Sequence, residues 1–160
     1  MINMLPYADA RQKVIEVARA LRQTSRTETI EIEQAFDRVL MREVRADRDY
    51  PPFNRSTRDG FAVRASDAAS PGSRLQCVGE LRAGSSFDGI VGAGQCVEIM
   101  TGASVPSGAD AVAMIEYTKR DGLTITLDRA VQRGDHIVPQ GSEARAGTLL
   151  VATGSRVGYA

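Results

Sequence analysis

Apolar positions recur with a helical period near the N-terminus of the chain. Between about Asp9 and Gln23, the apolar residues that share one helical face are Val14, Val17, Ala18 and Leu21, and charged residues fill the other face. This pattern predicts an amphipathic helix with Asp9 as its N-cap. A shorter apolar stripe over residues 35–40 predicts a second helix.

Elsewhere, apolar and polar residues mostly alternate with the period of two that is typical of strands. Strands are predicted over residues 30–32, 44–46, 61–64, 75–81, 96–100, 111–115, 123–127, 137–138 and 148–152. A predicted turn at residues 119–122 favours a hairpin between 111–115 and 123–127. Many short strands separated by Gly and Pro predict a mainly β (α+β) fold, with short, coiled β-sheets after the N-terminal helices.

The composition excludes several classes of protein. The chain has 160 residues, and its 20 basic and 20 acidic side chains give a net charge of zero. A nucleic-acid-binding protein would need a positive field, and the absence of Trp argues against a base-stacking platform. With no signal peptide and no apolar segment of membrane-spanning length, we expect a cytoplasmic protein that binds neither membrane nor nucleic acid. Cys77 and Cys96 form no C-x-x-C pair and are interpreted as small buried residues in a reducing compartment.

Two polar loops carry the candidate chemistry. The first runs from Pro51 to Gly60 and precedes a predicted strand, and the second runs from Thr101 to Asp110 and follows one. The pair Asp59-Gly60 has two interpretations: a simple turn, which is the commoner reason for this dipeptide, or an acid presented by a loop on a rigid element. Phosphate-binding glycine motifs and G-x-S-x-G are absent, and the sole histidine, His136, is interpreted as solvated.

Both loops resemble motifs of the MoeA family, the molybdopterin molybdotransferases that include the E domain of gephyrin. Pro52-Phe53, Ser56 and the segment 59–63 are similar to the family motif P-x-F-x-x-S-x-x-D-G-[YF]-A. The segment 99–112 is similar to I-M-T-G-A-x-V-P-x-G-A-D-A-V, with an acid, Glu116, just after it. The later glycines of the chain also resemble the family pattern: Gly134, Gly141-Ser142-Glu143, Gly147 and Gly154.

Two residues of the first loop depart from the family pattern. Asn54 stands where an Asp is common, and Arg58 stands where a Met is common. The Arg58 cation beside Asp59 is expected to favour the ionised carboxylate.

The resemblance runs from about Asp9 to the last residue and implies the two N-terminal modules of the family. It places domain I in residues 1–46 and 128–160 and domain II in residues 47–127. The C-terminal pterin-binding α/β domain of the family is expected to be absent from this chain.

The resemblance also implies an activity. The family inserts molybdate into adenylylated molybdopterin in a Mg²⁺-dependent step that gives molybdenum cofactor and AMP. Its active cleft lies between the α/β domain of one subunit and domain II of the other subunit of a homodimer. This chain is therefore expected to supply half of an intersubunit site and to be inactive alone. The alternative is a non-catalytic dimerisation or partner-binding module of the same fold.

The resemblance assigns roles to residues of the two loops. Asp59 and Thr101 are the expected catalytic residues, with Asp59 as a ligand of Mg²⁺, because this hard cation takes carboxylate oxygens. The expected substrate-binding residues are Ser56, Arg58, Gly60, Gly102, Glu116 and Glu143. Gly102 would let a backbone N–H approach an anion. For Thr101-Gly102, a simple turn remains the structural alternative, as a solvated acid does for Glu116 and Glu143.

Overall fold

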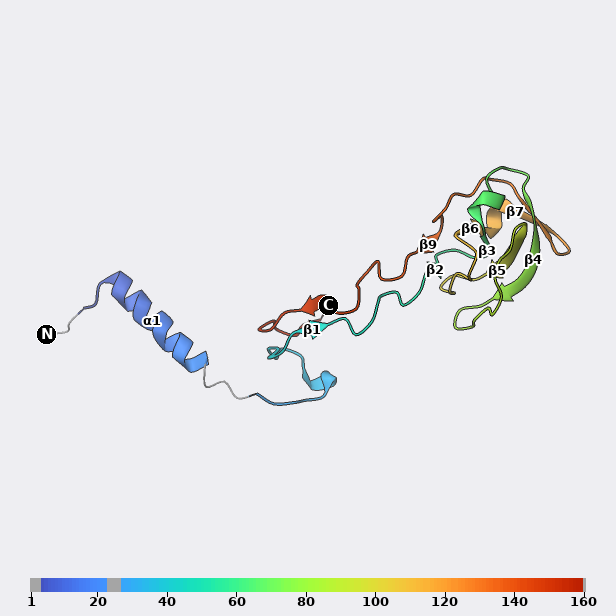
Figure 1. Ribbon diagram of the computed structural model, residues 1–160. Coiled ribbons are helices and arrows are strands. Elements are labelled where there is room, and N and C mark those ends of the chain that lie inside the picture. Colours follow the sequence, from blue (N-terminus) through green and yellow to red (C-terminus); the bar gives the residue numbers. More distant parts are fainter. Residues whose placement is uncertain (1–3, 23–26, 160) are drawn as a thin grey trace. The chain divides into compact units, whose positions relative to one another are not determined.

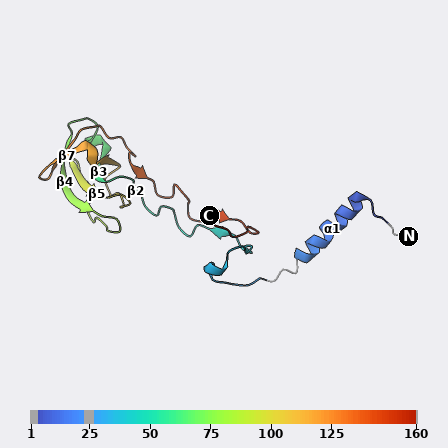
Figure 2. The ribbon, with the colours of Figure 1, turned by 180° about the vertical axis from the view of Figure 1, so that it is seen from behind.

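The structure, a computed structural model, describes residues 4–22 and 27–159. Within these residues it is mainly β, with one α-helix and ten short strands (Figures 1 and 2). The predicted fold class is confirmed, apart from the plural of N-terminal helices. None of the helices in the described residues is long and apolar enough to cross a bilayer.

The chain divides into two compact units, one made of residues 1–43 and 151–160 and the other of residues 44–150. The family resemblance placed the domain boundaries elsewhere, after residues 46 and 127. Those domain boundaries stay a prediction. All of the expected site residues belong to the unit 44–150.

The predicted N-terminal helix is α1 (Tyr7–Arg22). Asp9 lies in its first turn rather than at its N-cap, a position where a carboxylate still interacts favourably with the helix dipole. The second predicted helix, over residues 35–40, is wrong, and so is the strand at 30–32. A short 3₁₀ turn, η1 (Ile32–Gln34), precedes an extended segment whose Val39 pairs with Arg156. Pairing with the C-terminal segment satisfies the backbone that an isolated helical turn would leave unpaired.

The unit 44–150 contains a curled six-stranded sheet in the order β6-β3-β5-β4-β8-β7 (Figure 1). Its strands are β3 (Gly60–Val63), β4 (Arg74–Leu81), β5 (Gln95–Ile99), β6 (Ala111–Met114), β7 (Thr118–Asp121) and β8 (Thr124–Leu127). Neighbours are antiparallel except for the parallel pair β4–β5. Two smaller sheets pair β1 (Val44–Arg45) with β10 (Leu149–Val151) and β2 (Arg55–Ser56) with β9 (Ile137–Val138).

The predicted hairpin has a different first strand. Residues 118–121, which cover most of the predicted turn, form β7 and pair with β8, whereas β6 pairs with β3. The 3₁₀ turn η3 (Ile115–Tyr117) redirects the chain between β6 and β7. The alternation of apolar and polar residues over 123–127 therefore predicted a strand correctly, but it did not identify β7 as the strand that pairs with it.

The sheet buries both of its faces around β3. Phe61 and Val63 belong to one apolar cluster, and Ala62 belongs to another on the opposite face. All four residues of β3 are buried, which holds the loop before this strand on a rigid base. Cys77 and Cys96 are free thiols on the paired strands β4 and β5, and both are buried as predicted.

Candidate functional site

Asp59 and Thr101 meet because of the pairing of β3 with β5. Gly60 lies opposite Ile99 in this antiparallel pair, so the residue before β3 and the residues after β5 leave the sheet at the same end. The backbone N–H and the hydroxyl of Thr101 both donate to Oδ1 of Asp59, each at 2.7 Å. The two polar loops thus meet at Asp59, an acid of the first loop that accepts both hydrogen bonds from Thr101 of the second.

These two hydrogen bonds change the protonation of Asp59. The hydroxyl bond, followed by the amide bond, lowers the pKa of Asp59 from its ordinary value of 3.8, because both donors favour the ionised carboxylate. The shift has the direction expected from the Arg58 cation, but its causes are the two Thr101 hydrogen bonds. The Arg58 guanidinium instead makes a long contact of 3.4 Å with the carbonyl oxygen of Thr57.

Ser56 and Gly102 hold the two loops together. The buried Ser56 hydroxyl donates to the carbonyl oxygen of Arg58 at 2.6 Å and accepts from the Arg58 amide at 3.2 Å. Gly102 N–H donates to the carbonyl oxygen of Ser56, and Ser56 N–H donates to that of Ala103, both at 2.9 Å. The amide of Gly102 and the hydroxyl of Ser56, both expected to contact substrate, are therefore engaged within the protein.

Gly60 has a packing role. It is buried in β3, and a Cβ atom at this position would lie 1.9 Å from the carbonyl oxygen of Ala113 on β6. Only a residue without a side chain lets the two strands approach this closely. Its expected contact with substrate is untested, and the geometry already explains the glycine.

The two further acids lie beside the first loop. Glu116 is exposed in η3, and the residue before it, Ile115, donates its N–H to the carbonyl oxygen of Asp59 at 3.0 Å. Glu143 pairs with Arg55 at 3.3 Å, and the two side chains are 60% and 44% exposed. An ion pair this exposed contributes little to stability. Arg58, Glu116 and Glu143 are thus the expected substrate ligands that keep exposed charged groups.

Sequence reasoning missed the contacts that fix the segment carrying Glu143. Asp49 Oδ1 accepts from Ala146 N–H at 2.9 Å, and its Oδ2 accepts from Gln140 Nε2 at 3.0 Å. The backbone N–H of Gln140 donates to Oδ1 of Asn54 at 2.9 Å. Asn54, which differs from the family pattern, therefore makes a structural hydrogen bond. Asp49 fixes the segment 140–146 through its two hydrogen bonds. No signal in the alternating charges of residues 45–49 distinguishes Asp49.

The described residues offer little capacity to bind a metal ion. Across residues 4–22 and 27–159, no group of three His, Cys, Asp or Glu side chains is arranged to hold an ion. Oδ2 of Asp59 takes no hydrogen bond from these residues, so Asp59 offers one carboxylate oxygen. Mg²⁺ usually keeps several waters and takes one or two carboxylates together with substrate phosphates. One ionised carboxylate fits part of such a site.

Comparison with known proteins gives consistent matches. Residues 5–160 match the family described as "MoeA N-terminal region (domain I and II)". A Bacillus subtilis protein named molybdopterin molybdenumtransferase is 40% identical over 139 residues, covering 82% of this chain and 32% of that protein. A Staphylococcus aureus protein of the same name is 31% identical over 156 residues, covering 95% and 36%.

A solved structure agrees with these relatives. The molybdopterin biosynthesis MoeA protein of Pyrococcus horikoshii OT3 aligns with a TM-score of 0.77 and 31% identity, covering 81% of this chain and 35% of that one. The chain therefore spans about a third of the length of the relatives it matches. These matches confirm the resemblance drawn from the two loops.

Proposed function

Because the chain belongs to the family defined by the N-terminal region of MoeA, domains I and II, we propose that it supplies one half of a molybdopterin molybdotransferase site. The single observation that carries this proposal is the convergence of both family motifs on Asp59 through Thr101. In the proposed reaction, molybdate is inserted into adenylylated molybdopterin, and AMP is released.

Asp59 is the proposed ligand of Mg²⁺. When bound, Mg²⁺ neutralises negative charge that develops on the phosphate during adenylyl-phosphate cleavage. Thr101 favours the ionised form of Asp59 and leaves Oδ2 without a donor among the described residues, because both of its donors bond to Oδ1. The exposed Arg58 attracts the anionic substrates. Glu116 and Glu143 are the proposed outer acids, and Ser56, Gly60 and Gly102 set the positions of the loops.

The rest of the site lies outside this chain in the proposal. The relatives are about three times as long as the matched region, and their further length would supply the pterin-binding half. We propose that a homodimer joins this half to domain II of the neighbouring subunit. The chain alone is then expected to show no turnover.

A chimera tests this proposal. This chain would replace the matched third of the Bacillus subtilis protein, and molybdenum cofactor and AMP would be measured with adenylylated molybdopterin, molybdate and Mg²⁺. The chimera is expected to be active, and Asp59→Asn should lower kcat by about a hundredfold or more with an unchanged circular dichroism spectrum. Asp88→Asn is the control, because it makes the same change at an exposed acid that belongs to neither of the two polar loops. Equal activity of the two variants would remove Asp59 from the mechanism.

One observation favours the alternative, a dimerisation or partner-binding module. Three apolar residues of α1 are more than half exposed: Val14 at 68%, Val17 at 55% and Leu21 at 66%. Such a stripe is typical of a helix that packs against another chain or domain. The two functions separate in the chimera, because a folded, dimeric and inactive chimera would favour the module over the enzyme.

A further inference from the structure

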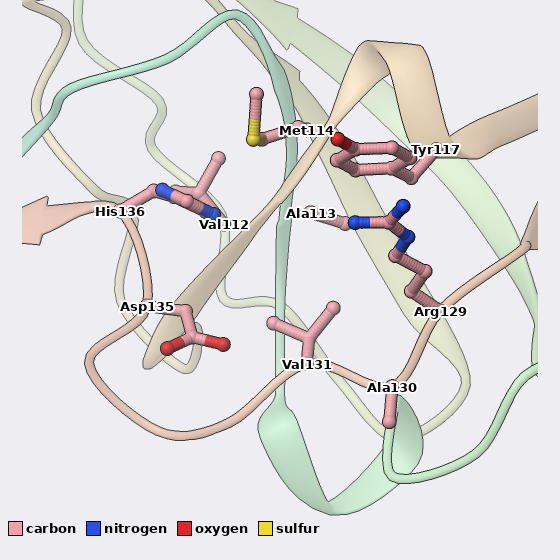
Figure 3. Close-up of a pocket in the computed structure, with 9 residues that line it drawn as sticks. All are labelled: Val112, Ala113, Met114, Tyr117, Arg129, Ala130, Val131, Asp135 and His136. Atoms are coloured by element: carbon pink, nitrogen blue, oxygen red, sulfur yellow. The ribbon is translucent and has the colours of Figure 1, made fainter.

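A cavity of the unit 44–150 lies beside β6 and contains none of the expected site residues. It is a partly open cavity of about 190 Å³, lined by β6, Tyr117 of η3 and the segment 129–136 (Figure 3). The apolar side chains Val112, Ala113 and Val131 lie between its two polar ends in Figure 3. The cavity therefore combines an apolar floor with polar groups, as small-molecule sites usually do.

One polar end of the cavity is the guanidinium of Arg129, which stacks on the ring of Tyr117. The guanidinium of Arg129 lies 3.7 Å from the centroid of the Tyr117 ring (Figure 3). In the described part of the chain, Arg129 has no ion pair and no hydrogen bond. Stacking on an aromatic face fixes the guanidinium plane and leaves its N–H donors available for a planar anion.

The other polar end is the imidazole of His136. Its backbone has a φ of +57°, which is uncommon for residues other than glycine, and its carbonyl oxygen accepts from Thr57 N–H at 2.9 Å. This backbone contact holds His136 in place, and its ring lines the cavity (Figure 3). Within the described residues, the ring makes no hydrogen bond. The one carboxylate of the lining, Asp135, accepts from Gln132 N–H at 2.8 Å.

We propose that this cavity binds a small organic carboxylate with a flat apolar body. The carboxylate pairs with Arg129, because a guanidinium fork matches two carboxylate oxygens. The apolar body lies on Val112 and Val131, and the imidazole ring of His136 packs against the far end of this body. A dry cavity of about 150 Å³ holds benzene, so a cavity of about 190 Å³ suits a molecule the size of benzoate. This inference goes beyond the proposed molybdotransferase half and does not depend on it.

The probe is benzoate, titrated into the ¹⁵N-labelled chain with backbone amide shifts as the readout. Benzamide is the neutral isostere, and inorganic phosphate is the anion without an apolar body. Benzoate is expected to shift the amides of Val112, Val131 and His136, and to bind at least about tenfold more tightly than either comparison compound, since a charge-assisted pair and the apolar contact are both needed.

Variants separate the cavity from general surface charge. Arg129→Gln should weaken benzoate binding by about tenfold or more, and Arg74→Gln, at an exposed arginine on β4, should leave it unchanged. His136→Asn removes the imidazole while tolerating the left-handed backbone, and it should weaken binding several-fold. Equal binding of benzoate and benzamide, equal effects of the two arginine variants, or shifts elsewhere on the chain would overturn the proposal.

Discussion

Thr101 presents two donors to a single carboxylate oxygen of Asp59. Its amide and its hydroxyl both lie 2.7 Å from Oδ1, and Oδ2 has no donor in the part of the chain that the structure describes. One oxygen thus fixes the orientation of the carboxylate, and the other stays available to a cation or substrate. Oδ1 of Asp59 thus serves to position the side chain, and Oδ2 is the atom that could bind a ligand.

The first prediction concerns the pKa of Asp59. Because its folded pKa is lowered from 3.8, the two bonds stabilise the fold above that value, and this contribution is lost as pH falls through the folded pKa. Thr101→Val removes the larger cause, so the pKa should rise toward 3.8 and the stability lost in acid through Asp59 should become smaller. Carboxyl ¹³C titration measures the shift. Thr57→Val, whose hydroxyl makes no hydrogen bond among the described residues, should leave the pKa unchanged.

The second prediction distinguishes positioning from substrate binding at Ser56. Ser56→Ala leaves the part-buried carbonyl and amide of Arg58 without their hydroxyl partner, so the free energy of unfolding should fall by about 1–3 kcal/mol. Urea unfolding of the 160-residue chain measures this loss without any substrate. In the chimera, the variant should lose activity mainly through loop disorder, and Ser56→Thr should restore part of it. An Ser56→Ala chain as stable as the parent would contradict the positioning role.

The sequence predicted the strands that both motifs flank, and the family resemblance named Asp59 and Thr101 as site residues, but their hydrogen bonds to each other were not predicted. Strand 61–64 and strand 96–100 are close to β3 and β5, and Asp59 and Thr101 lie at the ends that antiparallel pairing joins. The strand predictions succeeded because alternation is a local property. Which strands pair is a non-local property, and the hairpin prediction failed for that reason.

The network around Asp49 was also beyond a local argument. Asp49 is bonded to Gln140 and Ala146, which lie more than ninety residues away in the sequence. Its local context, a run of alternating charges, is the same as that of a solvated connection. Residues 35–40 show the reverse case, in which a helical stripe is overridden by pairing with the C-terminal segment. Tertiary hydrogen bonds decided both outcomes.

A third prediction concerns Gly60. A Cβ atom there would lie 1.9 Å from a backbone oxygen of Ala113, and a backbone atom in a sheet cannot move aside as a flexible side chain can. Gly60→Ala should therefore lower the free energy of unfolding by at least about 3 kcal/mol. Gly158→Ala is the control, because no atom lies within 4 Å of its added Cβ, and it should change stability by less than about 0.5 kcal/mol. Similar urea midpoints for the two variants would contradict the close approach of β3 and β6.

The fourth prediction concerns alkaline pH. Burial, with a further contribution from neighbouring Cys77, raises the pKa of Cys96 from 9.0 to about 12. Because the folded pKa is the higher one, the neutral thiol stabilises the fold fully below pH 9, and this contribution is lost as pH rises toward 12. The urea midpoint of the parent chain should fall across this window, in excess of the fall in Cys96→Ala. Cys77→Ala keeps the Cys96 thiol and should retain most of the excess. If the urea midpoints of Cys96→Ala and of the parent chain fall equally between pH 9 and 12, the buried thiol is not the group that titrates.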